Sequence, residues 1–111
     1  MKYLGKISSV TFGYGGYQEV CFGLTLTFEF DSSGISTFIG TWGIGTKVDK
    51  HTKWTEADRD KIFPDLVKEI NSLLDKAKVK DIYQLKGVPV EVICGGTGSP
   101  LESWRILEEV L

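Results

Sequence analysis

The stretch VCFGLTLTFEF, residues 20–30, alternates large apolar side chains with small or polar ones from end to end. Successive side chains of an extended strand point to opposite faces, so all even positions of this stretch share one face. Those positions hold only apolar residues: Val20, Phe22, Leu24, Leu26, Phe28 and Phe30. The pattern predicts a β-strand with one face in the core.

A second predicted strand, residues 3–12, precedes this one and has a less regular pattern. Ile7 and Val10 are three positions apart, so they can share a face only if a bulge or break lies between them. The GYGG segment at 13–16 then reads as the link of an antiparallel hairpin. Downstream, the turn residues of 31–34 lead into a short third strand over 35–39, and 40–54 form a longer loop.

A long amphipathic helix is predicted to begin at Thr55. Asp58 stands three positions later, which is the spacing of a capping box. Apolar residues then recur at steps of three and four and predict a stripe that packs on the sheet: Ile62, Phe63, Leu66, Val67, Ile70, Leu73, Leu74 and Ala77. Pro64 interrupts the pattern and predicts a kink or two abutting helices.

The remaining sequence predicts a helical turn over 81–85, closed by Lys86 and Gly87, and a fourth strand that alternates from Val88 to Cys94. A flexible turn at 95–100 leads to a fifth strand over 101–111. Its apolar residues fall on both faces, which indicates an inner strand or one whose outer side meets a helix or a partner chain. Trp104 is expected in the core, and Arg105 is expected to pair with nearby acids.

The expected fold is therefore α+β, with the order β-β-β-α-β-β in a single domain of residues 1–111. A largely antiparallel, twisted sheet would carry one main helix on one face. The alternative is an OB-like barrel, because that fold also uses three strands, a helix and two strands.

Composition limits the classes of function. The formal net charge of −2 provides no global field that would attract nucleic acid or anionic lipid. No apolar run has the length of a membrane span or a signal peptide, which predicts a cytoplasmic protein. Cys21 and Cys94 have no CxxC spacing, so two free thiols are favoured over a disulfide.

Known catalytic and cofactor motifs are absent from the sequence. Gly40 and Gly45 have the spacing of a phosphate loop, but Thr46-Lys47 follows them in place of Lys-Ser or Lys-Thr. No GxGxxG follows a strand and opens a helix. The single histidine, His51, has no set of metal ligands around it. We therefore predict no enzyme, no catalytic residues, no metal and no cofactor.

One candidate site remains. It consists of aromatic residues that lie among glycines and cations, in or beside the glycine segment 13–16 and the loop 40–54. Flat rings next to cations are what stacking on a nucleotide requires. The alternative is that these rings cap the edges of the core and the glycines serve only the turns. The candidate ligand-binding residues are Tyr14, Tyr17, Trp42, Lys47, His51, Lys53 and Trp54.

The chain also resembles a group of small proteins of tailed phages and prophages. The resemblance rests on four segments that cover nearly the whole chain: GGYQEVCFGLTLTF, HTKWTEADR, LKGVPVEV and LESWRILEEVL. One departure is GGTGSP after Cys94, which is longer and richer in glycine than the tight turn of that group. The resemblance implies a phage origin and action inside a bacterial cell, and it brings no catalytic residues.

The expected function is that of a phage-encoded binding protein without enzymatic activity. As a host-interaction or anti-defence factor, it would bind a host protein or sequester a nucleotide-type ligand, with a homo-oligomer left open and no membrane partner. The alternative is an OB-like accessory protein of phage replication or recombination that binds single-stranded nucleic acid. The acidic composition gives that alternative a weak electrostatic basis.

Overall fold

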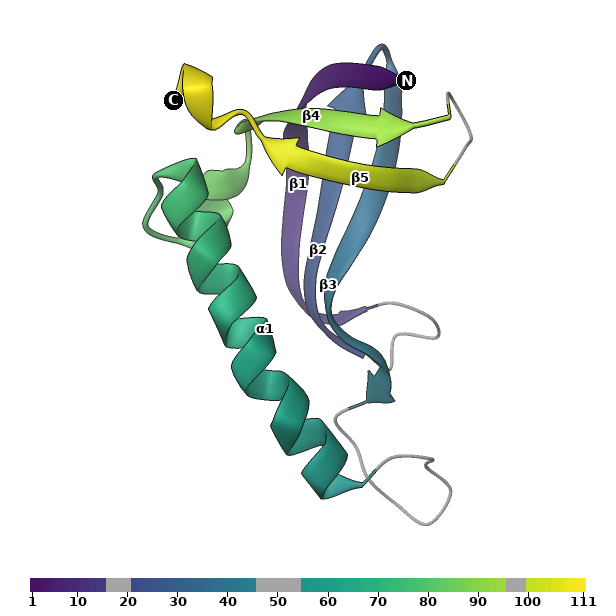
Figure 1. Cartoon of the computed structure of the whole chain (residues 1–111), viewed down its shortest axis with the longest axis vertical. Helices are drawn as coiled ribbons and strands as arrows, with labels where there is room; N and C mark the ends of the chain where they lie inside the picture. The colour runs from purple at the N-terminus through teal and green to yellow at the C-terminus, as the bar shows by residue number, and fades with distance from the viewer. Residues whose placement is uncertain (16–20, 46–54, 96–99) are drawn as a thin grey trace.

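The computed structural model describes residues 1–15, 21–45, 55–95 and 100–111, with the backbone alone for 41–45 and for Arg59. The described residues form an α+β fold, as predicted, with one long helix and a five-stranded sheet (Figure 1). The elements in chain order are β1 (Lys2–Gly15), β2 (Cys21–Phe30), β3 (Ser33–Gly45), α1 (Glu56–Ala77), η2 (Ile82–Leu85), β4 (Pro89–Cys94), β5 (Leu101–Ile106) and η3 (Glu108–Val110).

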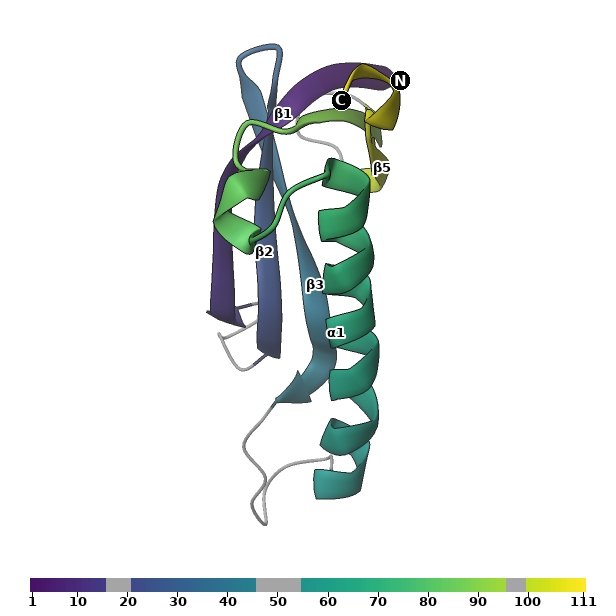
Figure 2. The same ribbon diagram turned by 90° about the vertical axis from the view of Figure 1, so that its left-hand side faces the viewer.

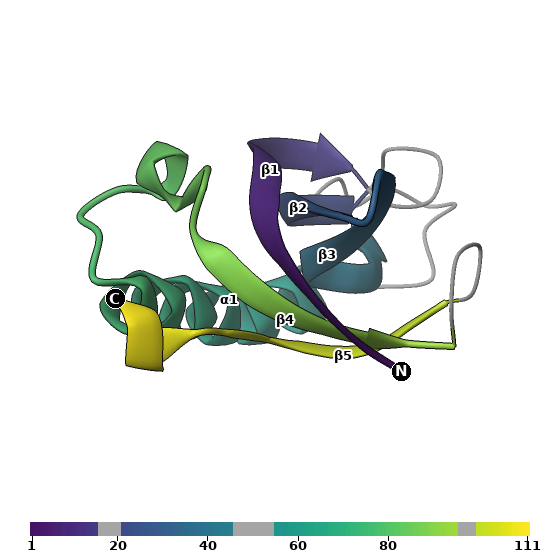
Figure 3. The same ribbon diagram turned by 90° about the horizontal axis from the view of Figure 1, so that it is seen from above.

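The sheet has the order β3-β2-β1-β4-β5, and every neighbouring pair is antiparallel. The first part of β1 pairs with β4, and β1 pairs with β2 from Lys6 to its end. As a result, β4 and β5 cross the upper end of the β1–β2–β3 layer (Figures 1 and 3). Strands β3 and β5 are the two edges, and no ladder joins them in the described residues, so the sheet is open on that side.

A bulge in β1 confirms the phase change predicted between Ile7 and Val10. The register shifts between Ile7 and Ser9, so that Ile7 pairs with Phe28 and Val10 with Leu26. Ile7 and Val10 therefore both face the core. The hydroxyl of Ser8 in the bulge donates a hydrogen bond to the carbonyl of Thr27 at 3.1 Å.

The core lies between the inner face of the sheet, α1 and η2. The predicted alternation of β2 is confirmed, because Leu24, Leu26 and Phe28 are fully buried. Trp104 packs against this core with its ring centroid 4.9 Å from that of Phe28, as expected. The other buried core members are Ile7, Phe30, Leu73, Ala77, Leu85, Val88, Val90, Val92, Cys94 and Ile106. Cys21 and Cys94 are both buried, and no disulfide joins them, as predicted.

The capping box at the start of α1 is confirmed. The Thr55 hydroxyl accepts a hydrogen bond from the Asp58 N–H at 3.2 Å, and the Asp58 carboxylate accepts one from the Thr55 N–H at 2.9 Å. The hydrogen bond from the Thr55 backbone, followed by that with its side chain, lowers the pKa of Asp58. The helix is one continuous element through Pro64, so the alternative of two abutting helices is wrong.

One residue of the predicted apolar stripe lies on the wrong side of α1. Leu66, Leu73 and Ala77 are buried, whereas the side chain of Val67 is 64% exposed. Val67 directly follows Leu66, and consecutive helical residues lie about 100° apart around the axis. None of the helices in the described ranges is both long and apolar enough to cross a membrane.

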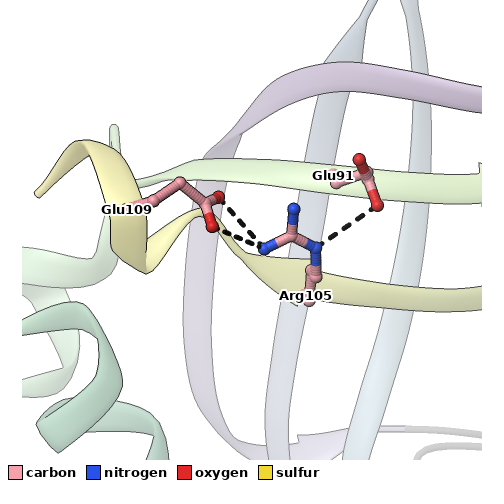
Figure 4. Close-up of polar contacts among 3 residues, drawn as sticks. All are labelled: Glu91, Arg105 and Glu109. Carbon is pink, nitrogen blue, oxygen red and sulfur yellow. Dashed lines mark hydrogen bonds and ion pairs between the residues drawn. The ribbon is translucent and has the colours of Figure 1, made fainter.

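The fifth strand is shorter than predicted and lies at the edge of the sheet. It ends at Ile106, after which the Leu107 N–H bonds to the carbonyl of Pro89 and η3 follows. Arg105 contacts the segment that follows, since its Nη1 lies 3.0 Å from both carboxylate oxygens of Glu109 (Figure 4). Its Nε also donates to Glu91 at 3.3 Å, so the expected acidic partners of Arg105 are confirmed.

Candidate aromatic binding site

The face of the sheet that forms the core is only partly buried. Phe12 pairs with Leu24 and Tyr14 pairs with Phe22, so both β1 residues lie on the face that buries Ile7. Exposure nevertheless rises along β1, from 0% at Ile7 to 42% at Phe12 and 58% at Tyr14. The lower end of this face therefore presents large aromatic side chains to solvent.

Four of these rings touch in sequence and form what we call the aromatic cluster: Phe12, Tyr14, Phe22 and Phe63. The Phe22 ring centroid lies 5.1 Å from that of Phe12 and 5.7 Å from that of Tyr14, with interplanar angles of 79° and 73°. Phe63 of α1 joins from the other side at 6.2 Å and 66°. Edge-to-face contacts at these separations are favourable, so the cluster connects β1, β2 and α1.

The position of α1 explains why this end stays exposed. The helix packs along β3, and Figure 2 shows β1, β2, β3 and α1 side by side in that order. Phe63 reaches Phe22 on β2, while Phe12 and Tyr14 on β1 lie farther from the helix. Phe12 and Tyr14 consequently remain partly exposed.

A bulge of β3 lies at the same level of the sheet. Between its ladder contacts with Gly23 and Cys21, β3 advances five positions, from Gly40 to Gly45, while β2 advances two. Three extra residues therefore leave the ladder opposite Phe22. Bulges are frequent beside functional sites, where they redirect the chain.

The structure bears on two of the seven predicted ligand residues. Tyr14 lies within β1 and not in a loop, because the strand continues through Gly15, past the predicted end at Phe12. Trp42 lies in the bulge of β3, which likewise runs beyond its predicted end at residue 39, and its side chain is not described. The others lie outside the described residues: Tyr17, Lys47, His51, Lys53 and Trp54.

Three members of the cluster were missed by sequence reasoning. It placed Phe12 at the end of the predicted strand 3–12, and it placed Phe22 and Phe63 on strand and helix faces directed to the core. A signal was present, because Phe12 and Tyr14 continue the alternation of the first strand into the glycine segment. Glycine favours turns, and the GYGG segment was therefore interpreted as the hairpin link.

The chemistry of the cluster is that of four rings and one phenol hydroxyl. In the described residues, no group of three or more His, Cys, Asp or Glu side chains could hold a metal ion. Exposed rings of this kind can stack on a flat ligand.

A hollow of about 320 Å³ lies between α1 and β5. Its lining includes Trp104, whose ring also packs on Phe28. The lining carries charges of both signs, with Lys76 and Arg105 beside Glu69 and Glu108. These charges select no sign of ligand charge, and the aromatic cluster remains the better candidate.

Fold and site together define an α+β protein with an open, curved antiparallel sheet and an exposed aromatic cluster at one end. No protein-family model, curated protein or solved structure matches this chain.

Proposed function

We propose that this chain is a small binding protein without enzymatic activity, and that its ligand carries a flat aromatic ring of the nucleotide type. The observation that supports this is the exposure of Phe12 and Tyr14, at 42% and 58%, on the face that forms the core elsewhere. Burial of an aromatic ring contributes favourable free energy to binding, and a flat ligand would bury these two rings.

The resemblance to phage proteins suggests the biological setting of this proposal. A host-interaction or anti-defence factor in a bacterial cell can act by sequestering a nucleotide-type ligand, which requires binding but no chemical step. The alternative is that a host protein covers the aromatic cluster. A pulldown from a bacterial host lysate tests for such a partner, and the experiment below tests for the nucleotide-type ligand.

The test is to denature freshly purified protein by heat and to analyse the released supernatant by absorbance at 260 nm and mass spectrometry. Protein freed of small molecules is then titrated calorimetrically with the four 5′-mononucleotides. We expect a released base-containing molecule, saturable heat with at least one mononucleotide, or both. A clean supernatant together with no heat from any mononucleotide contradicts the proposal. An unrelated protein of similar size, purified in parallel, is the control.

A second candidate is binding of single-stranded nucleic acid, which the strand order favours. The helix lies between β3 and β4, and β1 pairs with both β2 and β4, as expected for an OB-like arrangement. Exposed rings on such a sheet can stack successive bases. The test is a labelled oligonucleotide at several salt concentrations, and binding should weaken as salt rises. Absence of any shift at low salt removes this candidate.

A further inference from the structure

We infer that the free edge of β5 binds an extended peptide segment of a partner protein. The segment adds to the sheet as an antiparallel strand and places apolar side chains in the hollow between α1 and β5. The inference is independent of the proposed function, because it uses none of the residues of the aromatic cluster.

The hollow reaches the edge of β5 and does not lie over one face of the strand alone. Trp104, Arg105 and Ile106 all line it. Consecutive side chains of a strand point to opposite faces, so a hollow that three consecutive residues line extends to the edge of the strand. β5 is the outermost strand of the sheet on this side (Figure 1). Its free edge therefore adjoins the hollow.

The backbone of β5 offers hydrogen-bonding groups at this edge. The Leu107 N–H bonds to the carbonyl of Pro89 on β4, and the two strands pair in continuous antiparallel register from Ser103 to Ile106. An antiparallel strand directs alternate residues to its two sides, so the N–H and C=O groups of Trp104 and Ile106 point away from β4. These groups have no backbone partner among the described residues. Such an edge is a template for another strand.

The hollow provides a site for side chains of the added strand. A residue paired with Trp104 or Ile106 points to the same face of the sheet as they do, and both pack against the core on that face. Leu73 of α1 and Ile106 are buried apolar members of the lining. The volume of about 320 Å³ is small for a ligand pocket and suits side chains. Main-chain hydrogen bonds together with pockets for alternate side chains are how sheet edges bind peptides.

A second copy of this chain fits the edge less well than another protein. If two β5 edges paired about a twofold axis through both outward-directed residues, Trp104 would lie opposite Ile106 of the second copy. Arg105 would then lie opposite Arg105 of the second copy, and like charges directly opposite each other destabilise a sheet. The register of β5 shifts before Ser103, which limits pairing through earlier residues. The partner segment therefore carries two apolar residues separated by one residue that is not cationic.

The probe is an array of short, acetylated and amidated threonine peptides in which two positions, separated by one threonine, run through all residue types. The strongest binder is titrated with the full chain by fluorescence anisotropy. Two methylated versions of it test strand pairing. One carries a methyl group on the backbone nitrogen of a variable residue, which would point to β5. The other carries it on the nitrogen of the threonine between the variable positions, which would point away.

The variant Ser72→Phe tests the hollow, because Ser72 is an exposed residue of α1 that lines it. Asn71→Phe is the matched control, one position earlier on the same helix, also exposed and outside that lining. Circular dichroism checks the fold of both variants. Hydrogen exchange followed by NMR compares the amides of Trp104 and Ile106 with that of Arg105, which points to β4, in the free and the peptide-bound protein.

We expect the strongest peptides to carry apolar residues at both variable positions. Methylation of a variable residue should weaken binding by about 5- to 150-fold, since it leaves a carbonyl of β5 unpaired. Ser72→Phe should weaken binding by about tenfold or more, because the phenyl ring takes the place of an apolar side chain of the peptide. The control peptide and Asn71→Phe should stay within about twofold of the unmodified pair. The amides of Trp104 and Ile106 should exchange faster than that of Arg105 in the free protein and slow down when the peptide binds.

Several results overturn the inference. An array without binding, or without preference for apolar pairs, does so, as does equal binding of the two methylated peptides or of Ser72→Phe and Asn71→Phe. Slow exchange of the Trp104 and Ile106 amides in the free monomer would show that the edge is already covered. Slow exchange that appears only as the protein dimerises, measured by sedimentation, would identify a second copy as the occupant. None of these results bears on a nucleotide-type ligand at the aromatic cluster, which the heat-release experiment tests separately.

Discussion

Gly23 of β2 and Gly40 of β3 face each other so closely that a Cβ atom built on Gly23 would lie 2.7 Å from the Cα of Gly40. The same atom would also overlap the carbonyl oxygen of Ile39. Both obstacles are backbone, so a side chain at either position can be accommodated only if the two strands separate. This contact marks the base of the β3 bulge beside the aromatic cluster.

Gly23→Ala should therefore lower the free energy of unfolding by about 1–3 kcal/mol, the usual cost of overpacking a site that cannot relax. Gly34→Ala on β3 is the matched control, since its Cβ would meet only the carbonyl oxygen of Phe28, at an ordinary 3.5 Å. Urea denaturation measures both. Equal stabilities for the two variants would show that the strands separate without cost.

The capping box predicts a stability effect at the start of α1. Thr55→Ala removes the hydroxyl that accepts the Asp58 N–H and should cost about 1 kcal/mol, as for other N-cap replacements. Thermal unfolding at neutral pH measures this. Asn71→Ala, on an exposed position of the same helix, should have a smaller effect, and a larger effect would refute the assignment.

Asp58 should make stability depend on pH. Its pKa in the folded protein is lowered, first by the hydrogen bond from the Thr55 backbone, so its contribution is complete above the ordinary aspartate pKa. That contribution is lost as the pH falls through the lowered folded value. The stability difference between wild type and Asp58→Asn should thus shrink in acid. A difference that stays constant from neutral to strongly acidic pH contradicts this; Asp65→Asn is the control.

Arg105 should hold η3 on the sheet without contributing much to global stability. Its side chain is 52% exposed and that of Glu109 is 56% exposed, and ion pairs at such sites are weak. Arg105→Gln should accelerate hydrogen exchange of the amides of 108–111 and leave the unfolding midpoint nearly unchanged. Lys68→Gln, a neutralisation on the exposed side of α1, is the control. Unchanged exchange in Arg105→Gln would show that η3 is held by other contacts, such as the 3.1 Å hydrogen bond from Lys78 Nζ to the Leu111 carbonyl.

Pro64 should destabilise the helix that contains it. A proline inside a helix removes one backbone hydrogen bond and crowds the preceding turn, and Pro64 is exposed, so its replacement leaves no cavity. Pro64→Ala should raise the free energy of unfolding by about 1–3 kcal/mol. Ser72→Ala, which changes helix propensity alone, should gain no more than about 0.5 kcal/mol. Equal gains would mean that Pro64 fits the helix without strain.

Local patterns predicted the elements wherever one face of a strand or helix is buried along its length. The alternation of 20–30 predicted β2, and the odd spacing of Ile7 and Val10 predicted the bulge of β1, because burial enforces the phase of a strand. Local patterns failed to predict strand residues where glycines lie within a strand. Gly40 was assigned to a loop, whereas β3 needs a glycine there because Gly23 lies against it.

The candidate site was only partly predictable for a similar reason. Tyr14 was selected from its composition, as an aromatic among glycines. The ring contacts of Phe12, Phe22 and Phe63 depend on how much of the sheet α1 covers, and this is decided by packing between distant segments. No local periodicity of the sequence contains that information.

The shared strand β1 also has a consequence for the order of folding. Its ladder with β2 joins near neighbours in the chain, whereas its ladder with β4 pairs Lys2 with Ile93. Contacts between such distant residues form slowly, because a long loop must close first. In pulsed hydrogen exchange during refolding, we expect the amides of β2 to be protected before those of β4. On the ribosome, β1, β2 and β3 emerge ahead of both remaining strands, so the end of the sheet that carries Tyr14 is synthesised before the last part of the core.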